Sequence, residues 1–183
     1  LLHGFKQDGK YLFDLLKNVL PDDVAIVSPN GPLFIPVEKK DGYVMKYAWY
    51  FFDSIKKHYF IDYKPASEYI KSILIELDLF RKPITVIGYS QGGYLAPKIA
   101  EIVPTVNTVI GLGCVFRNHM FDVRASVIIN QINSKSDTVI DFDGAKEEFL
   151  KLSERGNIGH FVELDGPSHR LSNDYLFELA QFI

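Results

Sequence analysis

The stretch Ile84-Thr85-Val86-Ile87-Gly88-Tyr89-Ser90-Gln91-Gly92-Gly93 is the most informative part of the chain. Its first four residues are typical of a buried strand, and the apolar pattern that continues to Ile102 predicts a helix directly after it. Residues 88–92 fit G-x-S-x-G, in which a serine lies on a tight turn between a strand and a helix. Glycine is needed on both sides because a side chain there would clash with the neighbouring strand and helix. We therefore expect the Ser90 hydroxyl to be exposed at a helix N-terminus, where N–H groups favour developing negative charge.

Short apolar runs alternate with longer helical patterns on both sides of this stretch. Strands are expected at 24–27, 84–87, 108–112, 127–132 and 161–164, and helices at 65–77, 91–102, 144–152 and 173–182. This alternation predicts the α/β class, with a mostly parallel central sheet and helices on both faces, because parallel strands need crossover connections. No repeat, linker or break in composition divides the chain, so we expect a single domain over residues 1–183.

Composition excludes several classes of protein. The 183 residues are 47% hydrophobic, which argues against disorder, and carry a formal net charge of −3, which gives no basic footprint for nucleic acid. The single cysteine, Cys114, rules out a disulfide scaffold, and we expect it to be a buried apolar residue. No apolar run approaches the length that spans a bilayer, so we expect no stable membrane insertion. Neither a metal-ligand pattern nor a phosphate-binding loop is recognisable, so we expect no metal and no organic cofactor.

The chain opens abruptly, on Leu1 within an apolar run and not on Met. We expect an N-terminal piece of the native protein to be absent from this chain. A signal peptide could have been lost with it. A cytoplasmic location is the expectation from the remaining sequence, and the oligomeric state is left open.

A serine nucleophile needs a base, and the base needs an orienting acid. In hydrolases built on parallel sheets these follow the serine in the order acid, then histidine. His169 is the histidine that lies in a loop directly after a strand, so we expect it to be the base. The other four histidines precede Ser90 or lie in unsuitable positions: His3, His58, His119 and His160.

Four aspartates lie between Ser90 and His169 as candidates for the acid. Asp137 follows the buried strand expected at 127–132, which favours it. Asp141 is the alternative, although Asp141 and Asp143 are placed to begin the next helix, where carboxylates commonly serve as caps. Asp165 is close to His169 in sequence, but a short turn would not easily aim it at the imidazole.

Ester chemistry also needs two N–H groups that bind the developing oxyanion. The residue after the nucleophile, Gln91, supplies one. The run Leu1-Leu2-His3-Gly4-Phe5 is a strand end that breaks into a glycine turn, and the N–H of Phe5 is the second donor expected. His3 itself is expected to be structural.

Aromatic residues are concentrated between Tyr43 and Tyr63. This block is expected beside the active-site face, and Trp49 and Phe51 are candidates for the wall of a substrate pocket. Packing of the core beneath a long loop explains the same residues equally well.

The combined pattern resembles the α/β-hydrolase superfamily and, within it, the phospholipase/carboxylesterase family that includes acyl-protein thioesterases. The resemblance rests on blocks that cover nearly the whole chain: 2–4, 28–32, 48–53, 88–93, 137–140 and 166–169. It implies an α/β-hydrolase fold, a triad of Ser90, Asp137 and His169, and oxyanion donors at Phe5 and Gln91. It also implies one or two strands upstream of Leu1, which agrees with the abrupt start of the chain. The chain departs from the family in the acid loop, Asn133-Ser134-Lys135-Ser136-Asp137, where relatives often carry His-Gly. Pro97, inside the expected helix, is predicted to remove a backbone hydrogen bond there.

These observations predict a serine hydrolase that acts on carboxylic esters or thioesters of small-molecule or acylated substrates. A dienelactone-hydrolase-like or peptidase-like enzyme on the same fold is the alternative within hydrolases. A non-catalytic binding protein that keeps the fold is the alternative outside them, although loss of a triad member would be common in such a protein.

Overall fold

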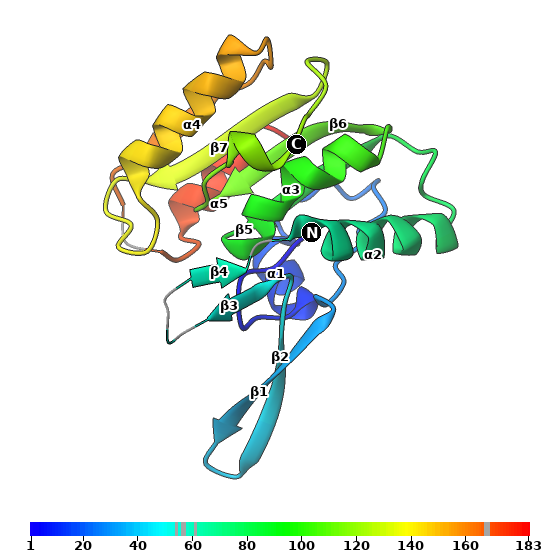
Figure 1. Cartoon of the computed structure of the whole chain (residues 1–183), viewed down its shortest axis with the longest axis vertical. Helices are drawn as coiled ribbons and strands as arrows, with labels where there is room; N and C mark the ends of the chain where they lie inside the picture. The colour runs from blue at the N-terminus through cyan, green and yellow to red at the C-terminus, as the bar shows by residue number, and fades with distance from the viewer. Residues whose placement is uncertain (54, 56–57, 61, 167–168) are drawn as a thin grey trace.

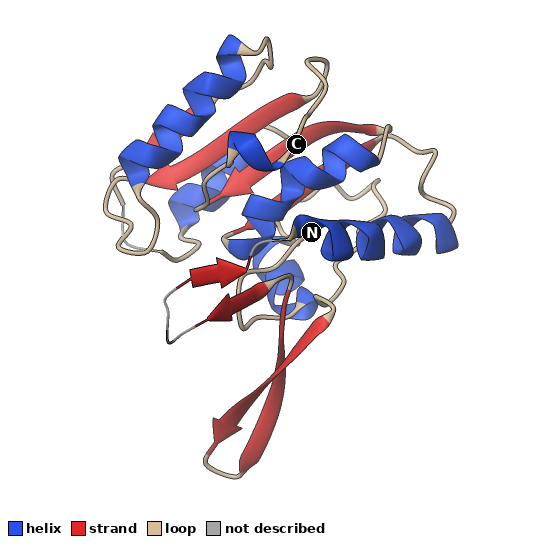
Figure 2. Cartoon of the chain, viewed as in Figure 1, coloured by secondary structure: helices blue, strands red, loops and turns tan. Residues whose placement is uncertain are grey.

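The computed structural model describes residues 1–53, 55, 58–60, 62–166 and 169–183. At its centre is a four-stranded parallel sheet in the order β5-β6-β7-β8 (Figures 1 and 2). Its strands are β5 (Ile84–Tyr89), β6 (Val106–Leu112), β7 (Ile128–Ser134) and β8 (Phe161–Leu164). Each expected strand in this part of the chain is confirmed, and the parallel arrangement is the one expected for an α/β-hydrolase fold.

Helices cover both faces of the sheet, as expected from the alternation. They are α1 (Gly9–Leu16), α2 (Tyr63–Glu76), α3 (Gln91–Ile102), α4 (Phe142–Glu154) and α5 (Asn173–Leu179), with a short 3₁₀ turn, η1 (Asn118–Met120). Successive strand residues point to opposite faces: Val86 belongs to the core formed with α2, α3 and α4, and Ile87 to the core formed with α1 and α5. The sheet is therefore buried on both sides. None of the helices in the described part of the chain is long and apolar enough to span a membrane.

Pro97 lies inside α3 and does not end it. Proline leaves the carbonyl four residues earlier without its helical partner and crowds it. That residue is Gly93, which has no side chain of its own to add to the crowding. The helix after the nucleophile is therefore continuous from Gln91 to Ile102.

Two antiparallel hairpins, which the apolar patterns of the sequence did not predict, lie between α1 and α2. The first pairs β1 (Leu33–Lys39) with β2 (Gly42–Ala48), and the second pairs β3 (Phe51–Asp53) with β4 (His58–Phe60). In Figure 1 the first hairpin projects well beyond the sheet and its helices. Large apolar side chains on it are exposed, among them Phe34 at 70% and Tyr43 at 72%. The hairpin is therefore held by the pairing of its two strands and by its attachment at the base, where the backbone of Gln7 pairs with that of Tyr47.

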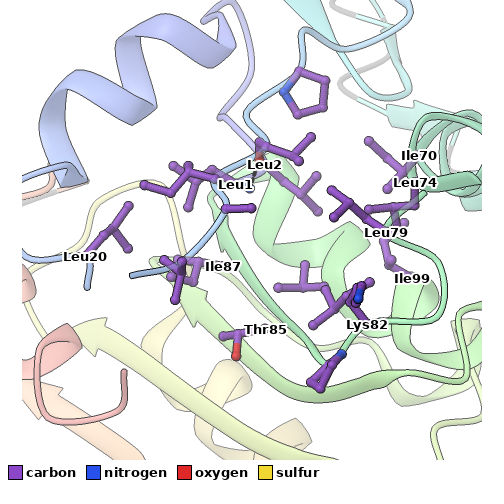
Figure 3. Close-up of a pocket in the computed structure, with 18 of the residues that line it drawn as sticks. Leu1, Leu2, Leu20, Ile70, Leu74, Leu79, Lys82, Thr85, Ile87 and Ile99 are labelled. Atoms are coloured by element: carbon purple, nitrogen blue, oxygen red, sulfur yellow. Dashed lines mark hydrogen bonds between the residues drawn. The ribbon is translucent and has the colours of Figure 1, made fainter. Parts of the chain in front are cut away.

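The strand expected at 24–27 is wrong: these residues form an extended loop. Their backbone has one described hydrogen bond, from the amino group of Leu1 to the carbonyl of Val27, at 2.6 Å. The neighbouring N-terminal segment pairs with β5 only through Leu2. Among the described residues it is therefore too short a strand for residues 24–27 to pair with. The loop instead forms one wall of an apolar groove of about 570 Å³ along the outer edge of β5 (Figure 3).

Candidate active site

Ser90 lies on the sharp turn between β5 and α3, at the carboxyl end of the strand. Its backbone has φ 50° and ψ −118°, a conformation that L-residues rarely adopt. A Cβ at Gly88 would meet the backbone of Gly92, and a Cβ at Gly92 would meet the carbonyl of Leu2. The two glycines thus allow α3 and the Leu2 backbone to approach the turn closely, as expected from the G-x-S-x-G pattern. Strain of this kind is characteristic of a nucleophile elbow.

His169 links the serine to an aspartate. Its Nε2 lies 2.8 Å from Ser90 Oγ and its Nδ1 lies 2.8 Å from Asp137 Oδ2. Because an ionised carboxylate only accepts, Nδ1 carries the proton and Nε2 accepts from the serine hydroxyl. This tautomer leaves the imidazole ready to take the serine proton. The three expected residues, from loops that follow β5, β7 and β8, are brought together at one edge of the sheet.

The Asp137 carboxylate is fixed by more than the imidazole. Its Oδ1 accepts from the N–H groups of Val139 and Ile140, at 2.8 and 2.9 Å, and its side chain is 1% exposed. These two hydrogen bonds fix the orientation of the carboxylate. Oδ2 is thereby aimed at His169.

Two of the other acidic candidates, Asp141 and Asp165, are engaged elsewhere, and Asp143 lies in the first turn of α4. Asp141 caps α4, where its side chain accepts from the N–H of Gly144, as its position in the sequence suggested. Asp165 pairs with Lys135 at 2.9 Å and its side chain is 88% exposed. Neither is described in contact with His169. The side chain of His58 lies outside the described residues.

The loop expected to hold the second oxyanion donor lies against the elbow. Leu2 pairs with β5 on either side of Gly88: its N–H donates to Ile87 and its carbonyl accepts from Tyr89, both at 2.9 Å. His3, buried, donates from Nδ1 to the carbonyl of Gly4 and accepts at Nε2 from the N–H of Gly31. Both of its ring nitrogens are therefore occupied by backbone groups.

The side chain of Gln91 has a role that sequence reasoning missed. Its Oε1 accepts from the N–H of Trp49 and its Nε2 donates to the carbonyl of Tyr50, both at 2.9 Å. The Trp49 indole in turn donates to the carbonyl of His3 at 2.8 Å. One buried network thus connects the first residue of α3, the aromatic block and the oxyanion loop.

A pocket of about 500 Å³ opens beside Ser90. Apolar and aromatic side chains form much of its wall, together with a few charged ones: Phe5, Tyr50, Tyr94, Val115, Arg117, His119, Val139, Ile140, Asp141, Glu147 and Glu148. Phe5 and Gln91, the expected oxyanion donors, line it together with the serine.

Two residues expected in the pocket wall do not form it. Trp49 is 2% exposed and packs into the core, where its indole is hydrogen-bonded, and Phe51 is 65% exposed on the first strand of the second hairpin. Tyr50, between them, reaches the pocket instead. Neighbouring residues in an extended segment point in different directions, so the aromatic block could not be assigned to one surface from composition.

Tyr89 and Tyr94 also border the site, and neither was identified from the sequence. The Tyr89 ring stacks on the His169 imidazole, with centroids 5.4 Å apart and an interplanar angle of 27°. Tyr94 comes one helical turn after Ser90, so it lies on the same side of α3 as the nucleophile. The helical period could have predicted this position from the sequence.

The loops that carry the acid and the base are tied to each other. Ser134 Oγ donates to the carbonyl of Gly166 at 2.7 Å and accepts from the N–H of Ser136 at 3.2 Å. The N–H of Ser134 donates to the hydroxyl of Tyr175 at 3.1 Å. The ends of β7 and β8 are thus held together beneath Asp137 and His169.

Solved structures of other proteins share the fold of this chain. SOBER1 of Arabidopsis thaliana has a similar structure, with a TM-score of 0.76 and 20% identity over 99% of this chain and 94% of that one. Esterase PE8 gives 0.78, at 20% identity over 99% and 88%, and Zea mays acyl-protein thioesterase 2 gives 0.75, at 16% over 99% and 89%. These likenesses show the shared fold. A search of curated protein sequences gave no match. The profile of the phospholipase/carboxylesterase family matches residues 1–183, so the chain belongs to this family of hydrolases.

Proposed function

We propose that the protein hydrolyses carboxylic esters or thioesters of small molecules through an acyl-enzyme on Ser90. The observation that carries the proposal is the His169 imidazole, held at 2.8 Å from both Ser90 Oγ and Asp137 Oδ2. Family membership supports the reaction class, since its members act on ester bonds.

The first half of the reaction begins with proton transfer. His169 Nε2 takes the hydroxyl proton as Ser90 Oγ attacks the acyl carbon, and Asp137 stabilises the imidazolium that forms. The imidazolium then gives its proton to the departing alcohol or thiol, which leaves the acyl group on the serine. Because Asp137 is buried and held by two N–H groups, it keeps the imidazole in position throughout.

We assign the binding of the negatively charged oxygen of the tetrahedral intermediate to the N–H groups of Phe5 and Gln91. Two observations support this role: both residues line the pocket with Ser90, and the Leu2 backbone is paired directly to the strand that carries the elbow. Gln91 begins α3, so the positive end of the helix adds to the stabilisation. In the second half, His169 activates water, which releases the acid and restores the serine.

A fluorophosphonate probe tests the proposal, because it labels a serine whose hydroxyl is activated by a neighbouring base. We expect one probe per chain, located on Ser90, and loss of both labelling and turnover of 4-nitrophenyl butyrate in Ser90→Ala. A panel of esters, a thioester and an amide then identifies the bond that is cleaved. Unchanged turnover in Ser90→Ala would overturn the mechanism, and absence of labelling together with absence of turnover would favour a non-catalytic binding protein.

A further inference from the structure

Arg117 places a guanidinium in the wall of the pocket that contains Ser90. The residue follows β6 and directly precedes η1, and both of its neighbours are fixed. Phe116 is fully buried, while Asn118 is 6% exposed and donates from its N–H and its Nδ2 to Glu148 on α4, at 3.0 and 2.6 Å. The backbone that carries the half-buried Arg117 side chain is therefore held by the fold on both sides.

The charge of this guanidinium is not paired within the described part of the chain. It lies over the ring of Tyr94, 5.5 Å from the centroid. No ion pair and no side-chain hydrogen bond joins it to another described residue, although a guanidinium has five N–H donors. Contact with a ring face orients the cation but satisfies none of these donors. Since Tyr94 is one turn after Ser90, the cation is oriented from the helix that carries the nucleophile.

The carboxylates of the same pocket are already engaged. Glu148 accepts from Asn118 and pairs with Lys151 at 2.8 Å, and Glu147 pairs with Lys151 at 2.9 Å. Asp141 caps α4. Arg117 is thus a pocket cation whose hydrogen-bonding capacity is unused among the described residues.

A second unused polar group lies near it. The Tyr63 hydroxyl belongs to a side chain that is 2% exposed and has no hydrogen-bond partner among the described residues. Burial raises the pKa of Tyr63, and the positive charge of Arg117 opposes that rise. The Tyr63 ring also packs on Tyr50, which lines the pocket, with centroids 5.4 Å apart.

We propose that Arg117 binds an anionic group of the substrate, so that the preferred ester or thioester carries a carboxylate near its scissile bond. The planar guanidinium matches the two oxygens of a carboxylate, and apolar residues around it would strengthen the pairing by excluding water. This inference rests on the hydrolysis proposed above and names the substrate class of that site. The anion can belong to the acyl part or to the alcohol part of the substrate.

Two matched pairs of esters test the proposal and distinguish these sources. On the acyl side, mono-4-nitrophenyl succinate is compared with 4-nitrophenyl pentanoate; on the alcohol side, 4-acetoxybenzoate is compared with 4-ethylphenyl acetate. The readout is the ratio of kcat/KM for the anionic ester to kcat/KM for its neutral counterpart. This ratio cancels general effects of a substitution on folding or on the triad.

In Arg117→Met we expect this ratio to fall about 10- to 100-fold for one of the pairs, mainly through KM, as expected for loss of a charge-assisted hydrogen bond. Arg117→Lys should recover part of the ratio, because it keeps the charge but loses the planar pair of donors. Arg81→Met is the matched control: it removes the same charge from an exposed residue before β5, whereas Ser90 follows the other end of that strand. It should leave the ratio unchanged.

Hydrolysis of all four esters with ratios that Arg117→Met does not change would overturn the inference and leave the proposed function intact. The inference also fails if Arg81→Met lowers the ratio as much as Arg117→Met, since the effect would then come from net charge alone. Absence of hydrolysis of every ester, with no fluorophosphonate labelling, would overturn the proposed function and this inference with it.

Discussion

The hydroxyl of Tyr89 donates to the backbone carbonyl of His169 at 3.0 Å, while its ring stacks on the imidazole of the same residue. The residue directly before the nucleophile thus holds the base from two directions. Tyr89 is 5% exposed, so the hydrogen bond is shielded from competing water.

Replacing Tyr89 by Phe removes the hydroxyl and keeps the ring. We expect kcat for a neutral ester to fall about fivefold, as for loss of one hydrogen bond of about 1 kcal/mol, with little change in KM. Steady-state kinetics measures this, with Tyr11→Phe, on an exposed face of α1, as the matched control. An unchanged kcat in Tyr89→Phe would show that the stacked ring alone is enough to hold the base.

Asp137→Asn is expected to lower kcat by about 10³- to 10⁴-fold, because an amide favours the wrong imidazole tautomer and cannot stabilise the imidazolium. Asp165→Asn, on the loop of the base but paired with Lys135, is the control and should retain its activity in the same steady-state assay. If Asp141→Asn caused the larger loss, the acid would have to be reassigned to Asp141.

Ser134→Ala removes the hydroxyl that ties the acid loop to the carbonyl of Gly166. Because Ser134 is fully buried, we expect the free energy of unfolding to fall by about 1–3 kcal/mol, measured by urea denaturation. The matched control is Ser72→Ala, whose hydroxyl also donates to a backbone carbonyl but at an exposed site. Equal losses in both variants would contradict a special role for the link between the loops.

The pKa of His3 is lowered from 6.5, chiefly by burial of the ring. A depressed pKa means that the unfolded chain binds the proton more readily, so His3 stabilises the fold above pH 6.5 and this contribution declines as the pH falls toward the folded pKa. Protonation would also place a donor at Nε2, opposite the N–H of Gly31. Between about pH 7.5 and pH 5.5, we expect the free energy of unfolding to fall less in His3→Gln than in the unsubstituted protein. Urea denaturation at each pH measures this. Parallel curves for the two proteins would contradict this.

The parts of the fold and site that could be predicted share one physical origin. Ser90, Asp137 and His169 each follow a strand of the central sheet, and the short apolar run of each strand and the break after it are both visible in the sequence. The helix between β5 and β6 was visible because its apolar period matches the helical turn.

What could not be predicted depends on partners that are distant in the sequence. Residues 24–27 have the composition of a strand, but a strand also needs a paired neighbour, which the segment lacks among the described residues. Likewise, the choice of Tyr50 over Trp49 and Phe51 follows from hydrogen bonds to Gln91, which local pattern does not reveal. The significance of Arg117 lies in the partners it does not have among the described residues, and only a structure can show that.

Gln91 combines two tasks in one residue, since its N–H is the proposed oxyanion donor and its side chain clamps the backbone at Trp49 and Tyr50. Almost any residue at position 91 would supply the N–H, but the two hydrogen bonds to the backbone of Trp49 and Tyr50 need the amide side chain. In a scan of all substitutions, position 91 should tolerate almost none, while Glu101, only half-buried near the other end of the same helix, tolerates many. Adaptation of this enzyme to new substrates is therefore expected to proceed through residues such as Tyr50 and Arg117, with Gln91 held constant.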